Sequence, residues 1–327
     1  MVCLDFKISH EAFSEKSGLS YVRVENLRRM KNIKLFAFGF SPTTRTASAS
    51  RSRRAWWRLK RFKQLCFHRH NFGDFLSYQL VSALSEPRVC IAGHEETGKF
   101  LAIGSILWSL QDNDVIWGSG AHREGQVPTR RIENCFAVRG PLTFSELRRA
   151  GVVGRDCQPL FFDPGILLPL LCPDLEKVEK ISGKTVVIPH YTDLEKLSQW
   201  QKQMGVNLSV IDPFDHPLKV ARRIVQAERV ISSSLHGLIL ADAFGVSAVP
   251  LRLDGNREPT FKYVDYYLGS GRSEPRFSTD LFEALDRHPR PFSYRSDDLS
   301  RFLSSFPFSM KPAYSSRVLP APSFAVA

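Results

Sequence analysis

Short apolar runs alternate with amphipathic stretches from residue 63 to residue 252, and this alternation constrains the fold more than any other feature. Runs such as RVCIAG, DVIWGSG, KTVVIPHY and RVISSS are short and end in glycine or polar residues, which indicates buried parallel strands. Stretches such as DFLSYQLVSAL and HPLKVARRIVQA place apolar residues at helical spacing. The pattern therefore predicts an α/β protein with helices on both faces of parallel sheets.

The alternation passes through two consecutive halves, which predicts two Rossmann-like domains, each with its own core, and a cleft between them. The first domain is predicted over residues 62–165 and begins with KQLCFH as its first strand. The second is predicted over residues 166–306, with the crossing near FFDPGILLPLL. The Pro/Ser-rich residues 307–327 are expected to form a loosely ordered tail.

The basic character of the chain is concentrated at its N-terminus. The net charge is +12, yet residues 1–63 hold 15 Lys/Arg and 4 Asp/Glu, and the rest holds 30 and 29. We interpret residues 1–61 as a basic, disordered extension. The alternative is peripheral contact with an anionic membrane surface, which basic residues interleaved with Trp56 and Trp57 would suit. The nearly neutral body argues against nucleic acid as a partner.

Several functional classes are disfavoured by what the sequence lacks. The six cysteines are scattered singly, which argues against a zinc site or a disulfide framework and fits a reducing compartment. No apolar run reaches the ~20 residues that span a bilayer. The first residues do not have the pattern of a secretory signal. These features predict a cytoplasmic enzyme, placed at the inner membrane face if the basic segment binds lipid.

The strongest local signal is RVISSSLHGLILADAFGVSAVP at residues 229–250. A strand stops at the serines and a helix of small residues starts near His236. Free backbone N–H groups and the helix dipole at such a junction favour an anion, and Gly237 permits close approach. A capped helix with a structurally satisfied histidine is the alternative. The carboxyl end of a strand is where open α/β sheets bind ligands, which favours a functional role.

Three further segments end strands with polar residues. NFGD places Asp74 near a helix start, where it is either functional or an N-cap. AVRGP ends in Arg139, which can hold a carboxylate or phosphate or form a structural ion pair. VIPHY ends in His190 and Tyr191, which are predicted to face the cleft. WGSG lacks the length and the lysine of a P-loop, so a nucleotide site is not indicated.

Together these segments resemble the polysaccharide pyruvyl transferase family. The resemblance lies in the order and spacing of NFGD, VIWGSG, VRGPLTFSELRRAGV, DPGILL, VIPHY and ISSSLHGLILADAFGV, from about Phe67 to about Leu253. It is nearest to the branch that acts on exopolysaccharides such as succinoglycan. Many members have arginine two positions before the histidine of the LHG motif, where this chain has Ser234, so another basic group must compensate.

The resemblance implies a GT-B-like bilobal pair of domains, phosphoenolpyruvate as donor, no metal and no other cofactor. The acceptor would be a sugar of an exopolysaccharide or of its lipid-linked precursor. Formation of a pyruvate ketal needs a proton at C3 of the enol and donors for a carboxylate and a phosphate.

His236 is predicted as the acid and phosphate contact, and Asp74 as a base or acceptor-orienting group. The predicted donor-binding residues are Arg139, His190, Ser233, Ser234, Leu235, Gly237 and Arg252. Arg252 is the candidate that replaces the missing arginine. The main alternative function is a GT-B-type glycosyltransferase that binds a nucleotide sugar in the same cleft.

Overall fold

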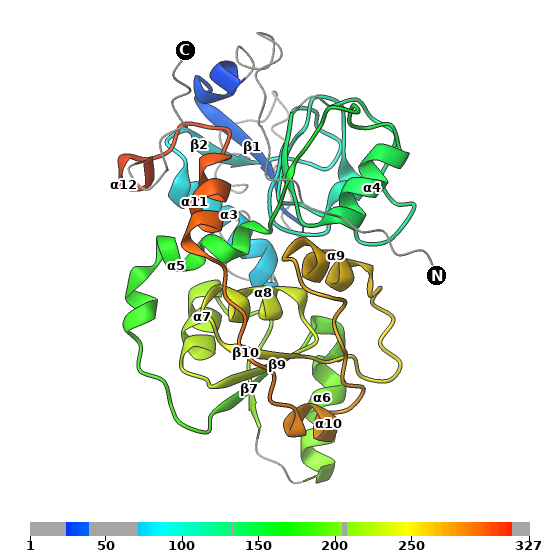
Figure 1. The fold of residues 1–327 in the computed structure, drawn as a ribbon, viewed down its shortest axis with the longest axis vertical. Helices are drawn as coiled ribbons and strands as arrows, with labels where there is room; N and C mark the ends of the chain where they lie inside the picture. The colour runs from blue at the N-terminus through cyan, green and yellow to red at the C-terminus, as the bar shows by residue number, and fades with distance from the viewer. Residues whose placement is uncertain (1–23, 39–70, 133, 205–207, 316–327) are drawn as a thin grey trace, which may run out of the picture.

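The structure contains two parallel sheets, one above the other (Figure 1). It is a computed structural model that describes residues 24–38, 71–132, 134–204 and 208–315. The strands of the two sheets follow the orders β2-β1-β3-β4-β5-β6 and β10-β9-β7-β8. Every pairing between these strands is parallel, so the predicted α/β class with parallel sheets is confirmed.

Seven strands follow the predicted apolar runs closely, and β1, β3 and β6 were not predicted. The strands are β1 (Asn32–Phe36), β2 (Arg88–Ile91), β3 (Phe100–Leu101), β4 (Val115–Trp117), β5 (Asn134–Val138), β6 (Leu160–Phe161), β7 (Thr185–Ile188), β8 (Ser209–Val210), β9 (Arg229–Ser232) and β10 (Ser247–Pro250). Within β4, Val115 and Trp117 pack on one face of the sheet and Ile116 on the other. This alternation is the side-chain period of a strand buried on both faces.

Helices cover both faces of each sheet, as the amphipathic stretches predict. The helices are α3 (Phe72–Leu84), α4 (Pro141–Arg149), α5 (Leu168–Leu171), α6 (Leu194–Met204), α7 (Pro217–Val225), α8 (Leu235–Ala243), α9 (Phe261–Gly269), α10 (Leu281–Asp286), α11 (Ser296–Ser304) and α12 (Pro312–Ser315). Short 3₁₀ turns are η1 (Leu107–Ser109), η2 (Pro164–Leu167), η3 (Pro173–Lys177) and η4 (Tyr191–Asp193). Among the described residues, no helix is long and apolar enough to cross a membrane.

The first domain begins earlier in the chain than predicted. Residues 32–36 were assigned to the basic extension, but they form β1, which pairs with β2 on one side and β3 on the other. Ile33 and Leu35 are completely buried in this strand. The basic residues around NIKLF favoured an extension, although alternate residues of this segment enter the core as in a strand. The predicted strand KQLCFH and the Trp-containing basic stretch lie outside the described residues.

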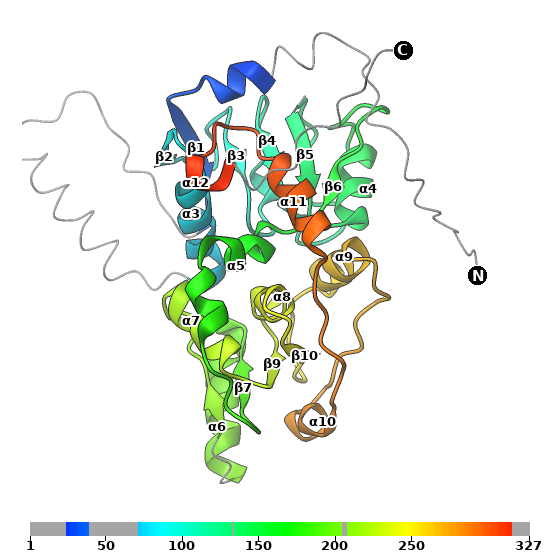
Figure 2. The same ribbon diagram turned by 60° about the vertical axis from the view of Figure 1, so that its left-hand side comes forward.

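The C-terminal segment belongs with the first sheet, which corrects the predicted domain end and tail. Phe302 of α11 stacks on Trp117 with ring centroids 4.6 Å apart, and Trp117 Nε1 donates to Ser305 Oγ at 2.9 Å. Further along, the N–H of Lys311 donates to the carbonyl of Leu84 at 2.9 Å. Figure 2 shows α11 and α12 beside the six-stranded sheet. The chain therefore crosses back after α10 to complete the first core.

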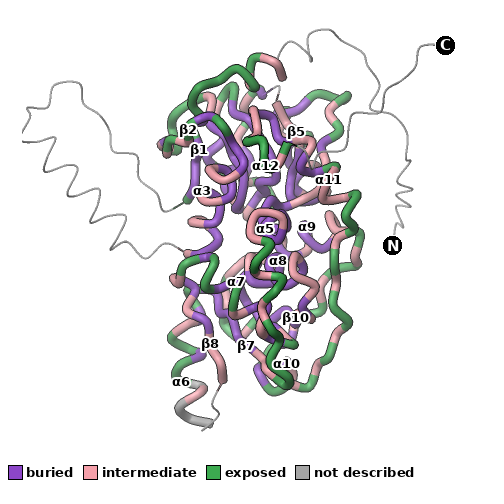
Figure 3. Tube along the Cα trace, turned by 90° about the vertical axis from the view of Figure 1, so that its left-hand side faces the viewer, coloured by how far each residue is buried: buried purple, intermediate pink, exposed green. Residues whose placement is uncertain are grey.

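A continuous core joins the two sheets, whereas the sequence predicted two separate cores. The largest buried cluster includes Ile33 and Trp117 of the first sheet together with Val186 and Val230 of the second. Helix α8 and turn η2 pack together between the sheets. Figure 3 shows buried chain extending through this middle region. The GT-B-like division into two lobes around a cleft stays a prediction.

Candidate active site

The candidate site lies where segments that follow strands of both sheets meet. Arg139 follows β5, and its Nε lies 3.1 Å from the carboxylate of Asp265 in α9. His122 follows β4, and its Nε2 lies 3.8 Å from the carboxylate of Glu258, which follows β10. Because parallel strands present their carboxyl ends at one edge, these two contacts join the carboxyl edges of the two sheets. Such edges are where open α/β sheets bind ligands.

Asp74 lies in the first turn of α3 at this junction. The N-terminus of α3 is held against the loop that follows β8 of the second sheet, since the N–H of Phe72 donates to the carbonyl of Pro213 at 2.8 Å. Asn71 is the N-cap and accepts from the N–H of Gly73 at 3.1 Å, so Asp74 is not the cap. Burial raises the pKa of Asp74 to about 7, and the charge of Lys262 opposes that rise. At neutral pH this carboxyl can both donate and accept a proton.

His236 faces Asp74's helix from the first turn of α8. A Cβ atom on Gly73 would lie 2.5 Å from Cγ of His236, so the ring packs directly on the backbone of α3. Nε2 of His236 is buried and has no hydrogen-bond partner among the described residues. Burial lowers the pKa of His236 to about 3, and the charges of Lys262 and Arg139 lower it further. The imidazole is therefore neutral in the free protein, with a ring nitrogen left for a ligand.

The three serines before α8 are buried, and two of them hold neighbouring strand ends. Ser232 Oγ donates to the carbonyl of Ile188 at 2.8 Å and accepts from the N–H of Ser234 at 3.0 Å. Ser233 Oγ accepts from the N–H of His190 at 2.8 Å. Ser234 is the N-cap residue of α8, but its side chain makes no capping hydrogen bond.

The residues on either side of His236 are packed into the fold. Leu235 is buried in the core beneath α8. Gly237 is required by close approach, since a Cβ there would overlap Ser232 Oγ. Both were predicted to line the donor site. Packing therefore explains why leucine and glycine stand at these two positions, and a ligand contact at either stays a prediction.

The histidine after β7 is placed at the same junction. His190 Nδ1 lies 2.7 Å from Thr192 Oγ1, and the ring of Tyr191 packs against the imidazole at 4.4 Å between centroids. Burial and the charge of Lys262 lower the pKa of His190 to about 4. Tyr191 itself is 45% exposed. The predicted VIPHY histidine therefore contributes a second neutral imidazole.

Arg139 is fully buried and already engaged by protein groups. Besides Asp265, it donates to Ser105 Oγ at 2.7 Å and to the carbonyl of Ala121 at 2.5 Å. Gly120 makes room for it, because a Cβ there would overlap the guanidinium. Of the two roles that the sequence allowed for Arg139, this geometry corresponds to the structural ion pair. A contact between Arg139 and a substrate stays a prediction.

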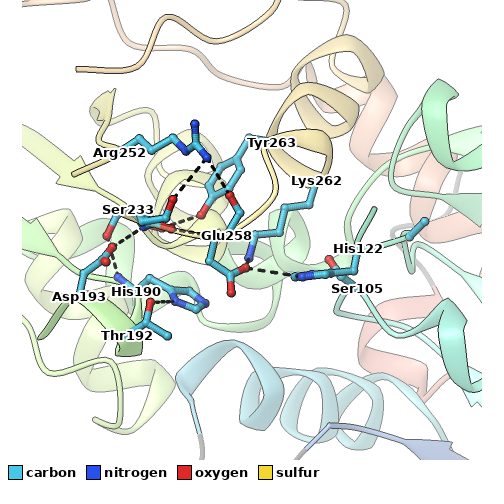
Figure 4. Close-up of polar contacts among 12 residues, drawn as sticks. Ser105, His122, His190, Thr192, Asp193, Ser233, Arg252, Glu258, Lys262 and Tyr263 are labelled. Atoms are coloured by element: carbon cyan, nitrogen blue, oxygen red, sulfur yellow. Dashed lines mark hydrogen bonds and ion pairs between the residues drawn. The ribbon is translucent and has the colours of Figure 1, made fainter. Parts of the chain in front are cut away.

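Arg252 lies at the exposed rim of the same region. Its Nη2 is 3.4 Å from the carbonyls of Asn256 and Glu258, and Figure 4 shows it on the side of Glu258 away from His122. The side chain is exposed in the structure. Its predicted role as the replacement for the missing arginine stays untested by this geometry.

Sequence reasoning missed three charged or titratable residues of the site: His122, Glu258 and Lys262. Lys262 Nζ lies 2.6 Å from the carboxylate of Glu258, and the lysine residue is only 7% exposed. Burial lowers the pKa of Lys262, and Glu258 opposes that shift. The i, i+4 spacing of glutamate and lysine in REPTFKYVDYY is a signal for their pairing. Their position between the sheets could not be read from that spacing.

The described residues contain no group of three or more His, Cys, Asp or Glu side chains placed to hold a metal ion. The site is a collection of separate proton-transfer groups near the buried cation Lys262. Asp74 is partly protonated near neutral pH, His190 and His236 are neutral, and Lys262 is paired with Glu258. This combination suits an anionic substrate whose reaction needs proton transfer.

Comparison with known proteins finds a family match for about half of the chain. Residues 95–255 match the sequence model of the family described as polysaccharide pyruvyl transferase. This part of the chain belongs to that family. The pyruvyl transferase segment contains His122, Arg139, His190 and His236, whereas Asp74 and Lys262 lie just outside its limits.

The chain is also similar to two individual proteins. The chain is 34% identical over 111 residues to the succinoglycan biosynthesis protein ExoV of Rhizobium meliloti (strain 1021), covering 34% of this chain and 32% of ExoV. It is 29% identical over 207 residues to an uncharacterized protein of Acanthamoeba polyphaga mimivirus, covering 60% of this chain and 69% of that protein. The chain therefore spans about a third of ExoV. No solved structure matches the chain.

Proposed function

We propose that this protein transfers the pyruvyl group of phosphoenolpyruvate to a sugar of an exopolysaccharide or its lipid-linked precursor, forming a pyruvate ketal. The observation that supports this most is the convergence of Asp74, His236 and Lys262 between the two sheets of a chain that contains a pyruvyl transferase segment. Transfer of this kind needs a proton donor, a proton acceptor and a cation for the donor's negative charges. The three residues supply these functions.

The reaction begins with protonation of the enol at C3, which makes C2 oxocarbenium-like. A sugar hydroxyl attacks C2 and loses its proton. The C2–O bond to phosphate then breaks, and a second hydroxyl of the same sugar closes the ketal ring with loss of its proton. Inorganic phosphate is the other product. The protonation of C3, the first hydroxyl attack and the ring closure each move a proton on or off a defined atom, so general acid and base groups account for much of the chemistry.

The pKa values support Asp74 as the acid toward C3, since burial keeps this carboxyl protonated up to about pH 7. The unpartnered Nε2 of the neutral His236 ring supports this residue as the acceptor of a hydroxyl proton. This assignment reverses the roles expected from the sequence. An acid with a pKa of about 3 would carry almost no proton at neutral pH, which is the reason for the reversal.

The first experiment measures ligand-induced stabilisation. Phosphoenolpyruvate should raise the melting temperature without added divalent metal, because a ligand that binds only the folded state stabilises it. A nucleotide sugar should have a smaller effect. If the nucleotide sugar stabilises the protein and phosphoenolpyruvate does not, the glycosyltransferase alternative replaces this proposal.

The second experiment tests the histidine. His236→Ala should lose roughly 100- to 10,000-fold in turnover, the range of a general acid or base, while the protein remains folded. Ser232→Ala is the matched control in the same turn, since it removes hydrogen bonds that hold the backbone and no predicted proton-transfer group. It should lower the melting temperature and largely preserve turnover. Near wild-type turnover by His236→Ala at saturating donor and acceptor would remove His236 from the mechanism.

A further inference from the structure

Lys262 is a buried cation in the first turn of α9. Its side chain is 9% exposed, and its Nζ lies 5.3 Å from the centroid of the Tyr263 ring. Burying an ammonium group is costly unless an anion or a set of acceptors compensates it. Glu258 provides that compensation at 2.6 Å. The structure therefore keeps an ammonium group out of water at the meeting point of the two sheets.

The charge of Lys262 acts on every titratable group assigned to the proton chemistry. It lowers the pKa values of His236 and His190 and opposes the upward shift of Asp74. It also lowers the pKa of His122. Since such interactions weaken with distance, these side chains lie within electrostatic range of the lysine. An anion that contacts His236 and Asp74 would consequently lie close to the Lys262 ammonium.

In the free protein the Glu258 carboxylate lies where an anionic ligand of Lys262 would bind. Its carboxylate lies between Lys262 and His122, 2.6 Å and 3.8 Å from their nitrogens (Figure 4). Its side chain is 18% exposed and that of His122 is 30% exposed, so both are more accessible than the lysine. A carboxylate with partial access to water can leave its partner at lower cost than one that is fully enclosed.

We propose that Lys262 binds an oxyanion of the donor, and that Glu258 is an internal counter-ion which the donor displaces. The inference rests on the proposed function for the identity of the donor. Phosphoenolpyruvate presents two oxyanion groups, a carboxylate and a phosphate, and either could occupy the place of the Glu258 carboxylate. Displacement makes the two residues oppose each other: the lysine favours donor binding and the glutamate competes with it.

The test measures phosphoenolpyruvate binding by calorimetry to two variants with opposite expected signs. Lys262→Met removes the ammonium with little change in volume and should weaken binding about 10- to 100-fold, the range for a hydrogen bond to a charged group. Glu258→Gln removes the competing charge and should tighten binding severalfold. Lys262→Arg, which retains the charge, should restore part of the affinity. The double variant Lys262→Met/Glu258→Gln leaves no unpaired charge and should still bind more weakly than the wild type.

A second ion pair of the same geometry provides the controls. Lys219 pairs with Asp215 at 2.8 Å, also with i, i+4 spacing, but Lys219 is 62% exposed on α7. Lys219→Met and Asp215→Asn should leave donor binding at the wild-type value. Melting temperatures of all variants establish that they are folded, and the double variant replaces Lys262→Met if that single variant is not.

Inorganic phosphate and pyruvate, used as separate probes, identify the oxyanion and separate this inference from the proposed function. If wild-type protein does not bind phosphoenolpyruvate, the proposed function fails. Stabilisation of the wild type by phosphate or pyruvate, absent in Lys262→Met, would still support the lysine site. Equal binding by the wild type and Lys262→Met overturns it, as does weaker binding by Glu258→Gln. A wild type stabilised by none of the three probes also overturns it.

Discussion

A methyl group added at Gly73 should inactivate the protein with little loss of stability. The Cβ of alanine would lie 2.5 Å from Cγ and 2.7 Å from Cε1 of His236, whereas ordinary contact begins near 3.4 Å. Nδ1 of His236 would lie closer still. The ring must therefore move by more than about 1 Å, a displacement that can cost about 100-fold in rate when a proton-transfer group is involved. We expect Gly73→Ala to lose about that factor in turnover.

The effect on stability should be much smaller. Alanine within a helix gains about 0.5–1 kcal/mol over glycine, and overpacking costs about 1–3 kcal/mol. The net loss is of the order of 1 kcal/mol, which leaves the protein folded. Phosphate release from phosphoenolpyruvate with a glycan acceptor gives the rate, and thermal unfolding gives the stability.

Gly154→Ala is the matched control, since a Cβ there would meet no atom within 4 Å. It should leave both turnover and melting temperature unchanged. In isotope-labelled protein, the His236 ring resonances should shift in Gly73→Ala and stay in place in Gly154→Ala. Wild-type turnover by Gly73→Ala would refute the reasoning, because it would show that the position of the His236 ring does not matter to the reaction.

Three further predictions concern pH, the first strand and the C-terminal helix. The pKa of Asp74 is about 7 in the folded protein and 3.8 in the unfolded chain. Asp74 therefore stabilises the fold at low pH, and this contribution is lost as pH rises from about 4 through 7. The melting temperature of Asp74→Asn relative to wild type should rise over that interval. Leu35→Asp should prevent folding because it buries a charge in β1, whereas Met30→Asp, at a position 40% exposed, should yield folded protein by circular dichroism. Phe302→Ala should reduce the free energy of unfolding by about 3–5 kcal/mol in denaturant titration, and a loss below 1 kcal/mol would show that α11 is not part of the first core.

The local sequence determined most of the secondary structure between residues 72 and 252. Pro141 starts α4 and Gly151 follows its end with a positive φ of 66°, as the pattern predicts. The apolar runs became strands because alternate residues enter cores on opposite faces of each sheet, and this requirement is written into consecutive positions. The strand-to-helix junction at His236 was predictable for the same reason: apolar run, serines, glycine and helix are neighbours in the chain.

The tertiary structure alone decided which distant residues share the site and the core. Trp117 and Phe302 are separated by most of the chain, and no local pattern indicated that α11 returns to the first sheet. Lys262 looked like one surface lysine among many, since charge and spacing do not reveal burial. It became the central cation only because α9 places it between two sheets, beside Glu258 and within electrostatic range of Asp74. Pairing and desolvation depend on position in space, and the sequence specifies that position only through the whole fold.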